Sequence, residues 1–185
     1  MDGEAQVGVR HAVAEDMPVI CEIVNYFIKN SWVNFRTRPQ TSQEWTSDWE
    51  RHRERYPWLV ATRQDEVIGV AYAAPFKPRE AYDWCVEVTV YVSHEIHRRG
   101  VGKTLYRHLI PILQDQGYRT MVAVIGLPNP NSVALHEAFG FEHAGTLRRV
   151  GYKFDEWHDV GFWQRTVVSD GGRPLPIRPL AGLRP

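Results

Sequence analysis

The sequence predicts an α/β fold in which helices cover a mixed β-sheet. Segments with apolar residues at helical spacing alternate with shorter β-branched segments, in the order helix, helix, hairpin, strand, helix, strand, helix and two strands. The chain has 185 residues, the length of one ordinary domain. Its 43% hydrophobic and 24% charged residues are close to the average for globular proteins, so disorder of the whole chain is excluded.

The first half of the chain predicts two helices and a hairpin. Apolar side chains recur at helical spacing within residues 14–30, which we expect to form an amphipathic helix. Residues 31–57 mix aromatic and charged side chains, and a second helix is expected over part of this segment. Two apolar segments, 58–62 and 67–74, are separated by a short turn containing Asp65 and predict a β-hairpin.

The strand predicted at residues 85–92 alternates strictly. Its valines share one face, whereas Glu87 lies on the other. A helix is expected over residues 100–116, because apolar side chains again recur at helical spacing and Gly117 follows as a stop signal. Residues 120–126 then predict another buried strand.

A short helix at residues 132–139 and two strands at 144–152 and 158–168 complete the predicted domain, which spans residues 1–168. Residues 169–185 contain four prolines and three glycines and show no periodicity that could bury a face. We expect this segment to be a flexible tail.

Charge and cysteine content exclude several classes of protein. The 22 basic and 22 acidic residues balance, so the composition gives no reason to expect nucleic acid as a partner. Cys21 and Cys85 are too few for a disulfide framework, no Cys/His spacing suggests a metal ion, and we expect both thiols to be buried and inert. The N-terminus is acidic and no run approaches about 18 apolar residues, so we expect a cytoplasmic protein that does not enter a membrane.

The junction between the strand at 85–92 and the following helix, residues 97–105, has the features of a phosphate-binding loop. Gly100 and Gly102 precede or open the helix, so backbone N–H groups are uncovered where the helix dipole is positive. A plain helix start remains an alternative. Nearby cationic side chains that reinforce the signal are those of Arg98, Arg99 and Lys103.

Three common phosphate or metal motifs fail at this junction. A Walker A loop needs glycine where His97 stands, and the dinucleotide fingerprint needs a third glycine where Leu105 stands. A zinc HExxH motif beginning at His94 needs histidine where Arg98 stands.

The remaining pattern resembles the acetyl-CoA loop of the GNAT superfamily of N-acetyltransferases, (Gln/Arg)-x-x-Gly-x-(Gly/Ala), with His97 in its first position. A second element follows one strand later, where Asn129, Ser132 and His136 resemble the superfamily's Asn-x-x-Ala-x-x-x-Tyr segment. A Phe-Gly-Phe sequence at 139–141 resembles its terminal Gly-Phe. Two motifs in the right order are far more specific than either one.

Within that superfamily the chain resembles the phosphinothricin N-acetyltransferase family over nearly the whole predicted domain. The segments that carry this resemblance are 33–37, 43–46, 53–61, 81–84, 89–93, 122–129 and 157–164. The resemblance implies the GNAT fold, with a mixed, mostly antiparallel central sheet, helices on both faces and a splayed strand that binds acetyl-CoA. It also implies a homodimer and acetylation of the free amino group of phosphinothricin, or alternatively of methionine sulfoximine or another small amino acid.

Acetyl transfer to an amine needs a base, and Glu87 on the polar side of the strand is placed to serve, although an ordinary exposed carboxylate is the alternative. The resemblance also places the family's base there. His136 stands where many GNAT enzymes carry the tyrosine that protonates the coenzyme A thiolate, and Tyr106 is a rival donor. No nucleophile is paired with a base, so we expect direct transfer without a covalent enzyme intermediate.

The resemblance also implies how acetyl-CoA is bound. The main chain of Val90, Tyr91 and Val92 is expected along the pantetheine arm, with Asn129 as a hydrogen-bond partner. The pyrophosphate is expected on a loop consisting of Arg98, Arg99, Gly100, Val101, Gly102, Lys103 and Thr104.

An anionic amino acid calls for cationic partners on loops near Glu87. The candidates for substrate binding are Phe35, Arg36, Lys77, Arg79 and Tyr82. A non-catalytic acyl-CoA sensor is the alternative outside the enzyme class, and Glu87 and His136 argue against it.

Overall fold

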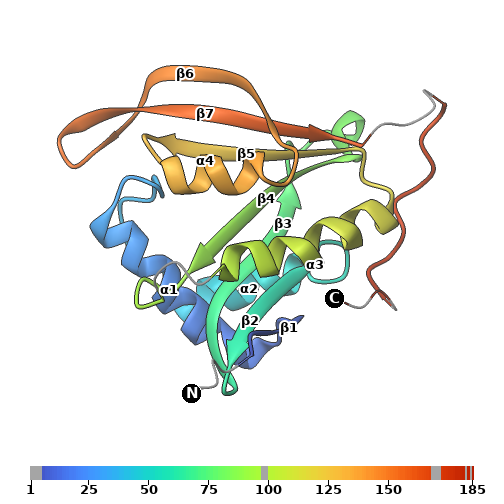
Figure 1. Cartoon of the computed structure of the whole chain (residues 1–185), viewed down its shortest axis with the longest axis horizontal. Coiled ribbons are helices and arrows are strands. Elements are labelled where there is room, and N and C mark those ends of the chain that lie inside the picture. The colour runs from blue at the N-terminus through green and yellow to red at the C-terminus, as the bar shows by residue number, and fades with distance from the viewer. Residues whose placement is uncertain (1–5, 97–99, 168–171, 182, 184) are drawn as a thin grey trace.

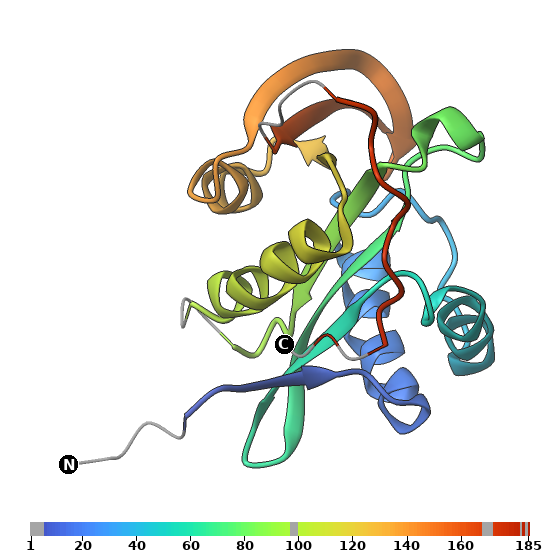
Figure 2. The same ribbon diagram turned by 90° about the vertical axis from the view of Figure 1, so that its right-hand side faces the viewer.

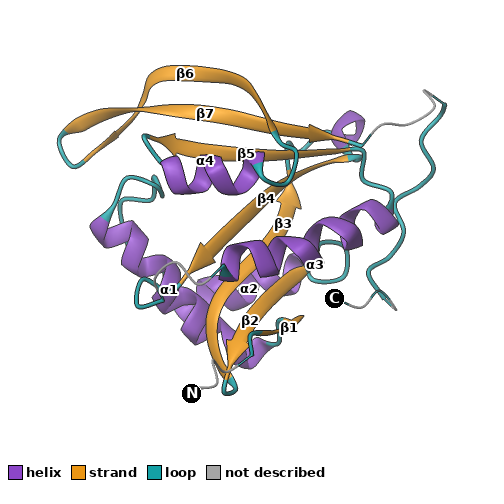
Figure 3. Ribbon diagram, viewed as in Figure 1, coloured by secondary structure: helices purple, strands orange, loops and turns teal. Residues whose placement is uncertain are grey.

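The computed structural model describes residues 6–96, 100–167, 172–181, 183 and 185. The described residues form one seven-stranded sheet with helices on both faces (Figures 1 and 3). Along the chain the strands are β1 Gly8–His11, β2 Trp58–Arg63, β3 Glu66–Pro75, β4 Cys85–Val92, β5 Thr120–Leu127, β6 Glu142–Lys153 and β7 Glu156–Thr166. The helices are α1 Met17–Asn30, α2 Ser42–His52, α3 Val101–Gln116 and α4 Pro130–Glu137, with short 3₁₀ helices at Ala14–Asp16 and Glu80–Tyr82.

The strand order across the sheet is β1-β2-β3-β4-β5-β7-β6. Only the β4–β5 pair is parallel, and all the other pairs are antiparallel. The predicted mixed, mostly antiparallel sheet is therefore confirmed. The four-residue strand β1 was not predicted, because it is too short to show an alternating pattern.

Helices cover both faces of the sheet (Figure 2), and each face carries its own apolar core. On one face, α3 packs mainly against β2, β3 and β4, with Leu105 and Leu109 buried among Val86 and Val88. On the opposite face, α1 and α2 pack against β2 and β3 through side chains such as Trp45. Because successive residues of a strand point to opposite faces, Val86 and Glu87 belong to different sides of the molecule.

The two parallel strands in the middle of the sheet separate after a short paired stretch. The register of β4 with β5 consists of Cys85 with Thr120, Val86 with Met121 and Glu87 with Val122. Beyond Glu87, β4 remains paired with β3 whereas β5 remains paired with β7. In Figure 1 the two strands diverge from their meeting point on the right of the view, which confirms the splayed strand.

Residues 172–181 run along the domain instead of projecting from it (Figure 2). The indole Nε1 of Trp84 donates to Leu175 O at 2.7 Å, and the side-chain amide of the fully buried Gln116 donates to Arg178 O at 3.1 Å. Ile177 packs against the larger core. The prediction of a flexible tail did not anticipate these contacts, because they join main-chain carbonyls to side chains far away in the sequence.

Candidate active site

A cleft of about 340 Å³ lies where β4 and β5 separate. Residues 88–92 line one side and residues 123–126 the other. It is also lined from the α3 face of the sheet, by Gly102, Asn129, Asn131, Ser132, Leu135 and His136, and from the α1 face, by Phe27 and Val33. The cleft therefore connects the two faces of the sheet.

Glu87 pairs with Val122 in the last β4–β5 pair before the strands separate, and it immediately precedes Val88, which lines the cleft; Glu87 itself is not among the lining residues. Its neighbour on β3 is Ala74, whose small side chain leaves the carboxylate half-buried rather than covered. Within the described part of the chain the Glu87 carboxylate accepts no hydrogen bond. Burial raises its pKa above the ordinary value, and the positive charge of Lys77 partly opposes that shift. A carboxylate of this kind is a suitable proton acceptor.

The thiol of Cys85 stands two residues before Glu87. Cys85 is half-buried and Cys21 is buried, so the expectation that both cysteines are buried is wrong for Cys85. Burial, together with the nearby negative charge of Glu87, raises the pKa of Cys85 to about 11. Since only a thiolate is a strong nucleophile, this shift favours the neutral, unreactive form of Cys85 at neutral pH.

The two predicted proton donors, Tyr106 and His136, contact each other. Tyr106 Oη lies 2.8 Å from His136 Nε2, and His136 Nδ1 lies 2.7 Å from the carbonyl oxygen of Ser132. Because that carbonyl can only accept, Nδ1 carries the proton and Tyr106 donates to Nε2. Burial lowers the pKa of His136 and raises that of Tyr106, so both groups are neutral at pH 7.

This pairing leaves neither proton free toward the cleft. His136 is 3% exposed and borders the cleft, whereas Tyr106 is fully buried and does not. The Ser132 hydroxyl lies 3.4 Å from His136 Nδ1, and Ser132 also lines the cleft. The structure thus joins the two alternatives into one hydrogen-bonded unit.

The start of α3 has the geometry expected of a pyrophosphate site. Gly100 is left-handed at φ 71° and precedes the helix without a side-chain cap. A side chain at Gly102 would meet Leu135 at 3.2 Å, and Gly102 lines the cleft. Lys103 is exposed, and Thr104 Oγ1 donates to Gly100 O. The Val101 side chain is buried in the core, so only the backbone N–H of Val101 is available to bind a phosphate. Arg98 and Arg99 lie outside the described residues.

The residues predicted along the pantetheine arm fit that part of the cleft. Val90, Tyr91 and Val92 line it, on the β4 edge that has left β5. Asn129 also lines the cleft; its Oδ1 accepts from Ser132 N at 3.2 Å as the cap of α4, which leaves its Nδ2 available to a ligand. The residues present therefore fit acetyl-CoA.

The predicted substrate residues lie on two segments, the loop after α1 and the segment between β3 and β4. Phe35 and Arg36 lie in the loop after α1. Burial raises the pKa of Tyr91, and the hydrogen bond from Asn34 and the positive charge of Arg36 partly oppose that shift. Lys77 acts electrostatically on Glu87. None of these five residues is among those that line the cleft; Arg79 is exposed, and Tyr82 packs edge-on against Phe76 with 5.8 Å between ring centroids.

Two polar contacts near the cleft were not predicted from the sequence. Asn34 Nδ2 donates to Tyr91 Oη at 3.0 Å, and Lys153 Nζ donates to Asn34 O at 2.6 Å. No sequence signal could have found these contacts, because the partners are 57 and 119 residues apart.

Among the described residues, no three His, Cys, Asp or Glu side chains gather closely enough to hold a metal ion. Within the same residues, no helix has the length and apolar character needed to cross a bilayer.

Comparison with known proteins agrees with this geometry. The model of the acetyltransferase (GNAT) domain matches residues 9–161. The chain is 57% identical to a phosphinothricin N-acetyltransferase of Streptomyces viridochromogenes over 94% of both chains. It is 35% identical to an L-methionine sulfoximine/L-methionine sulfone acetyltransferase of Pseudomonas aeruginosa, over 90% of this chain and 98% of that one.

A solved structure shows the same fold. The phosphinothricin acetyltransferase of Sinorhizobium meliloti, crystallised in complex with acetyl-CoA, superposes with a TM-score of 0.87 at 34% identity, over 96% of this chain and 95% of that one. The matching domain model and the high identity over nearly full length define the relationship. The chain belongs to the GNAT acetyltransferases and, within them, to the phosphinothricin N-acetyltransferase family.

Proposed function

We propose that the protein transfers the acetyl group of acetyl-CoA to the free amino group of phosphinothricin, in the cytoplasm, where acetyl-CoA is available. The 57% identity to the Streptomyces viridochromogenes enzyme supports this substrate. The observation that carries the proposal is the Glu87 carboxylate, with its raised pKa, at the point where β4 and β5 part.

Acetyl-CoA, when bound, supplies the acetyl group as a thioester. The freed edge of β4 at residues 88–92 holds the pantetheine arm through its main chain, with Asn129 Nδ2 as a donor. The N–H groups at the start of α3, from Val101 to Lys103, hold the pyrophosphate.

Glu87 prepares the amino acid for attack. The α-ammonium group is mostly protonated at neutral pH and has no lone pair to attack with. Glu87 accepts one of its protons, directly or through water, and its raised pKa brings the carboxylate closer to the operating pH. The nitrogen loses a second proton when the amide forms, and this proton is available to the departing thiolate.

The Tyr106–His136 pair positions α4 in this scheme and does not supply a proton. Both imidazole nitrogens of His136 are engaged in hydrogen bonds, and the imidazole and the Tyr106 hydroxyl are both neutral. The pair fixes the first turn of α4, from which Ser132 and Asn129 reach the cleft.

Cationic side chains on the Glu87 face recognise the anionic groups of the substrate. Lys77 and Arg36 are the two whose charges act on Glu87 and Tyr91 respectively. Arginine suits bidentate recognition of a carboxylate or a phosphinate.

Methionine sulfoximine is the second candidate substrate, and the 35% identity to the Pseudomonas aeruginosa enzyme favours it as a related activity. The experiment is thiol release from acetyl-CoA, with kcat/KM compared for phosphinothricin, methionine sulfoximine, glutamate and a peptide amine. A preference for phosphinothricin of about 100-fold or more supports the proposal. Preference for methionine sulfoximine establishes the alternative, and no turnover despite acetyl-CoA binding rejects both.

We also propose a homodimer formed through the β6–β7 hairpin. This hairpin exposes large apolar side chains that a monomer rarely leaves in water. They are Leu147, Val150, Tyr152, Phe154 and Trp157, each more than half exposed. Light scattering during gel filtration is expected to give the mass of two chains, and of one chain for Trp157→Lys; a wild-type monomer at micromolar concentration rejects the dimer.

A further inference from the structure

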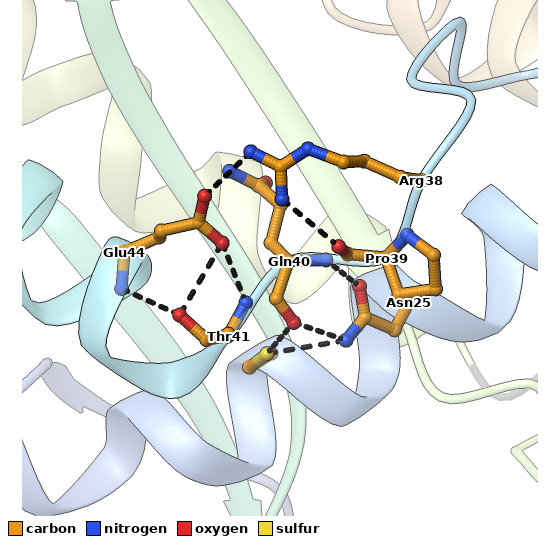
Figure 4. Close-up of polar contacts among 7 residues, drawn as sticks. Asn25, Arg38, Pro39, Gln40, Thr41 and Glu44 are labelled. Atoms are coloured by element: carbon orange, nitrogen blue, oxygen red, sulfur yellow. Dashed lines mark hydrogen bonds and ion pairs between the residues drawn. The ribbon is translucent and has the colours of Figure 1, made fainter.

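The loop between α1 and α2, residues 31–41, is fixed at both ends. At its start, Ser31 Oγ donates to Phe27 O at 2.9 Å. At its far end, the Asn25 side chain exchanges two hydrogen bonds of 2.8 Å with the main chain of Gln40 (Figure 4). Thr41 and Glu44 then form a capping box that begins α2. We call residues 31–41 the acceptor loop, because it carries Val33, Phe35 and Arg36 on the Glu87 face.

Lys153, at the end of β6, holds the middle of the acceptor loop. It is 6% exposed, and its Nζ donates to Ile28 O at 2.7 Å and to Asn34 O at 2.6 Å. Ile28 lies in the last turn of α1, where helix carbonyls lack partners and the helix dipole attracts a cation. No carboxylate of the described residues forms an ion pair with Lys153, so two main-chain carbonyls are its chief partners.

Asn34 extends this connection to the strand that lines the cleft. Its Oδ1 accepts from Arg36 N at 2.9 Å, which folds the loop back on itself, and its Nδ2 donates to Tyr91 Oη at 3.0 Å. Tyr91 is four residues beyond Glu87 and on the same face of β4. Val33, which precedes Asn34, lines the cleft directly.

Two glycines let the acceptor loop lie directly on the sheet. A Cβ at Gly151 would come within 2.8 Å of the Phe35 ring, and a Cβ at Gly126 within 2.9 Å of Trp32 O. The Trp32 ring also stacks on His158 of β7, with 5.4 Å between centroids. The loop is therefore seated on β5, β6 and β7 over a surface shaped to accept it.

We infer that Lys153 is a positioning residue for the acceptor amino acid: by binding Ile28 O and Asn34 O, it sets the acceptor loop against Tyr91 and so fixes the wall of the cleft on the Glu87 face. The hydrogen bonds that Lys153 makes within the described residues go to Ile28 and Asn34, and not to β4 or α3, where we propose that acetyl-CoA binds. This inference rests on the proposed acetylation of an amino acid.

The test is Lys153→Met, which keeps the aliphatic stem and removes the donor, with Lys29→Met as the matched control. Lys29 is an exposed lysine in the last turn of the same helix that Lys153 caps. For Lys153→Met we expect KM for phosphinothricin to rise at least 10-fold and KM for acetyl-CoA to stay within 2-fold. Lys153→Arg, which retains a buried donor, should recover part of the loss. Equal changes in both KM values, or none in a folded protein, overturn the inference.

Hydrogen exchange tests this inference independently of the proposed function. It remains informative if the variant is poorly folded or if the wild-type protein shows no turnover. If Lys153 holds the loop, exchange in residues 31–41 of Lys153→Met accelerates at least 10-fold, whereas exchange in α3 matches that of Lys29→Met. Unchanged exchange in residues 31–41, or acceleration throughout the chain, contradicts the positioning role whatever substrate is turned over. Absence of wild-type turnover together with accelerated loop exchange rejects the substrate and retains the loop contact.

Discussion

Tyr106 and His136 act as one neutral hydrogen-bonded pair, with 2.8 Å between Oη and Nε2, at the junction of α3 and α4. Each was predicted separately as the group that protonates the leaving thiolate. Tyr106 and His136 hydrogen-bond to each other, and His136 Nδ1 also donates to the Ser132 carbonyl. The pair therefore links α3 to α4 and holds α4 beside the cleft.

Replacement of Tyr106 by phenylalanine tests that role. The change leaves His136 Nε2 buried without a partner, which is expected to cost about 1–3 kcal/mol of unfolding free energy. Turnover should fall by less than about 10-fold, because no proton is lost from the reaction. Urea denaturation and thiol release measure the two effects. A fall in kcat of about 10²-fold or more with unchanged stability would restore Tyr106 as the acid.

The pH dependence of kcat/KM is expected to follow the Glu87 carboxylate. Its pKa is raised, so the base is protonated and inactive at low pH, and activity rises as pH passes through that raised value. Lys77→Met removes the positive charge that opposes this shift and should move the acidic limb of the profile to higher pH. Arg79→Met, a neighbouring exposed cation, is the control and should leave the limb in place. A limb that moves equally in both variants would show a general change of surface charge.

Gly100 and Gly117 flank α3 and both adopt left-handed backbone conformations, at φ 71° and 100°. Neither position has an atom within 4 Å of an added Cβ, so alanine at each costs only backbone strain, about 1 kcal/mol. If the start of α3 holds the pyrophosphate, Gly100→Ala should also raise KM for acetyl-CoA several-fold, whereas Gly117→Ala should not. Denaturation and KM measurements on both variants check this, and equal KM values would remove Gly100 from the binding loop.

Removal of residues 172–185 tests whether the C-terminal segment belongs to the fold. The truncated chain loses the bonds from Trp84 to Leu175 O and from Gln116 to Arg178 O. Exposing these groups is expected to lower the unfolding free energy by about 1–3 kcal/mol. Identical denaturation curves would show that the segment is the flexible tail that its composition predicts.

Local patterns were sufficient to predict most of the sheet and helices. The alternation of residues 85–92 placed Glu87 on the face away from the α3 core, and the structure has it there. The Gly100–Gly102 pattern and the Asn129–His136 segment converge on one cleft. These features depend on residues close together in the sequence, which is why periodicity and motif spacing reveal them.

Contacts between distant residues could not be predicted in this way. Lys153 resembles any lysine at the end of a strand, and its partners Ile28 and Asn34 are a helix residue and a loop residue far along the chain. The docking of residues 172–181 depends on main-chain carbonyls, which carry no sequence identity. Likewise, Arg79 and Tyr82 were predicted from the resemblance of the segment before β4 to the family, and neither is among the residues that line the cleft.

The most direct test of the account is Glu87→Gln, which keeps the shape of the side chain and removes its basicity. Acetyl-CoA affinity, measured by calorimetry, should stay within about 2-fold, because Glu87 lies outside the proposed pantetheine and pyrophosphate contacts. Acetylation of phosphinothricin should fall by about 10²–10⁴-fold, the usual contribution of a general base. Turnover that stays within about 2-fold of the wild type, with acetyl-CoA still bound, would contradict the central role of Glu87.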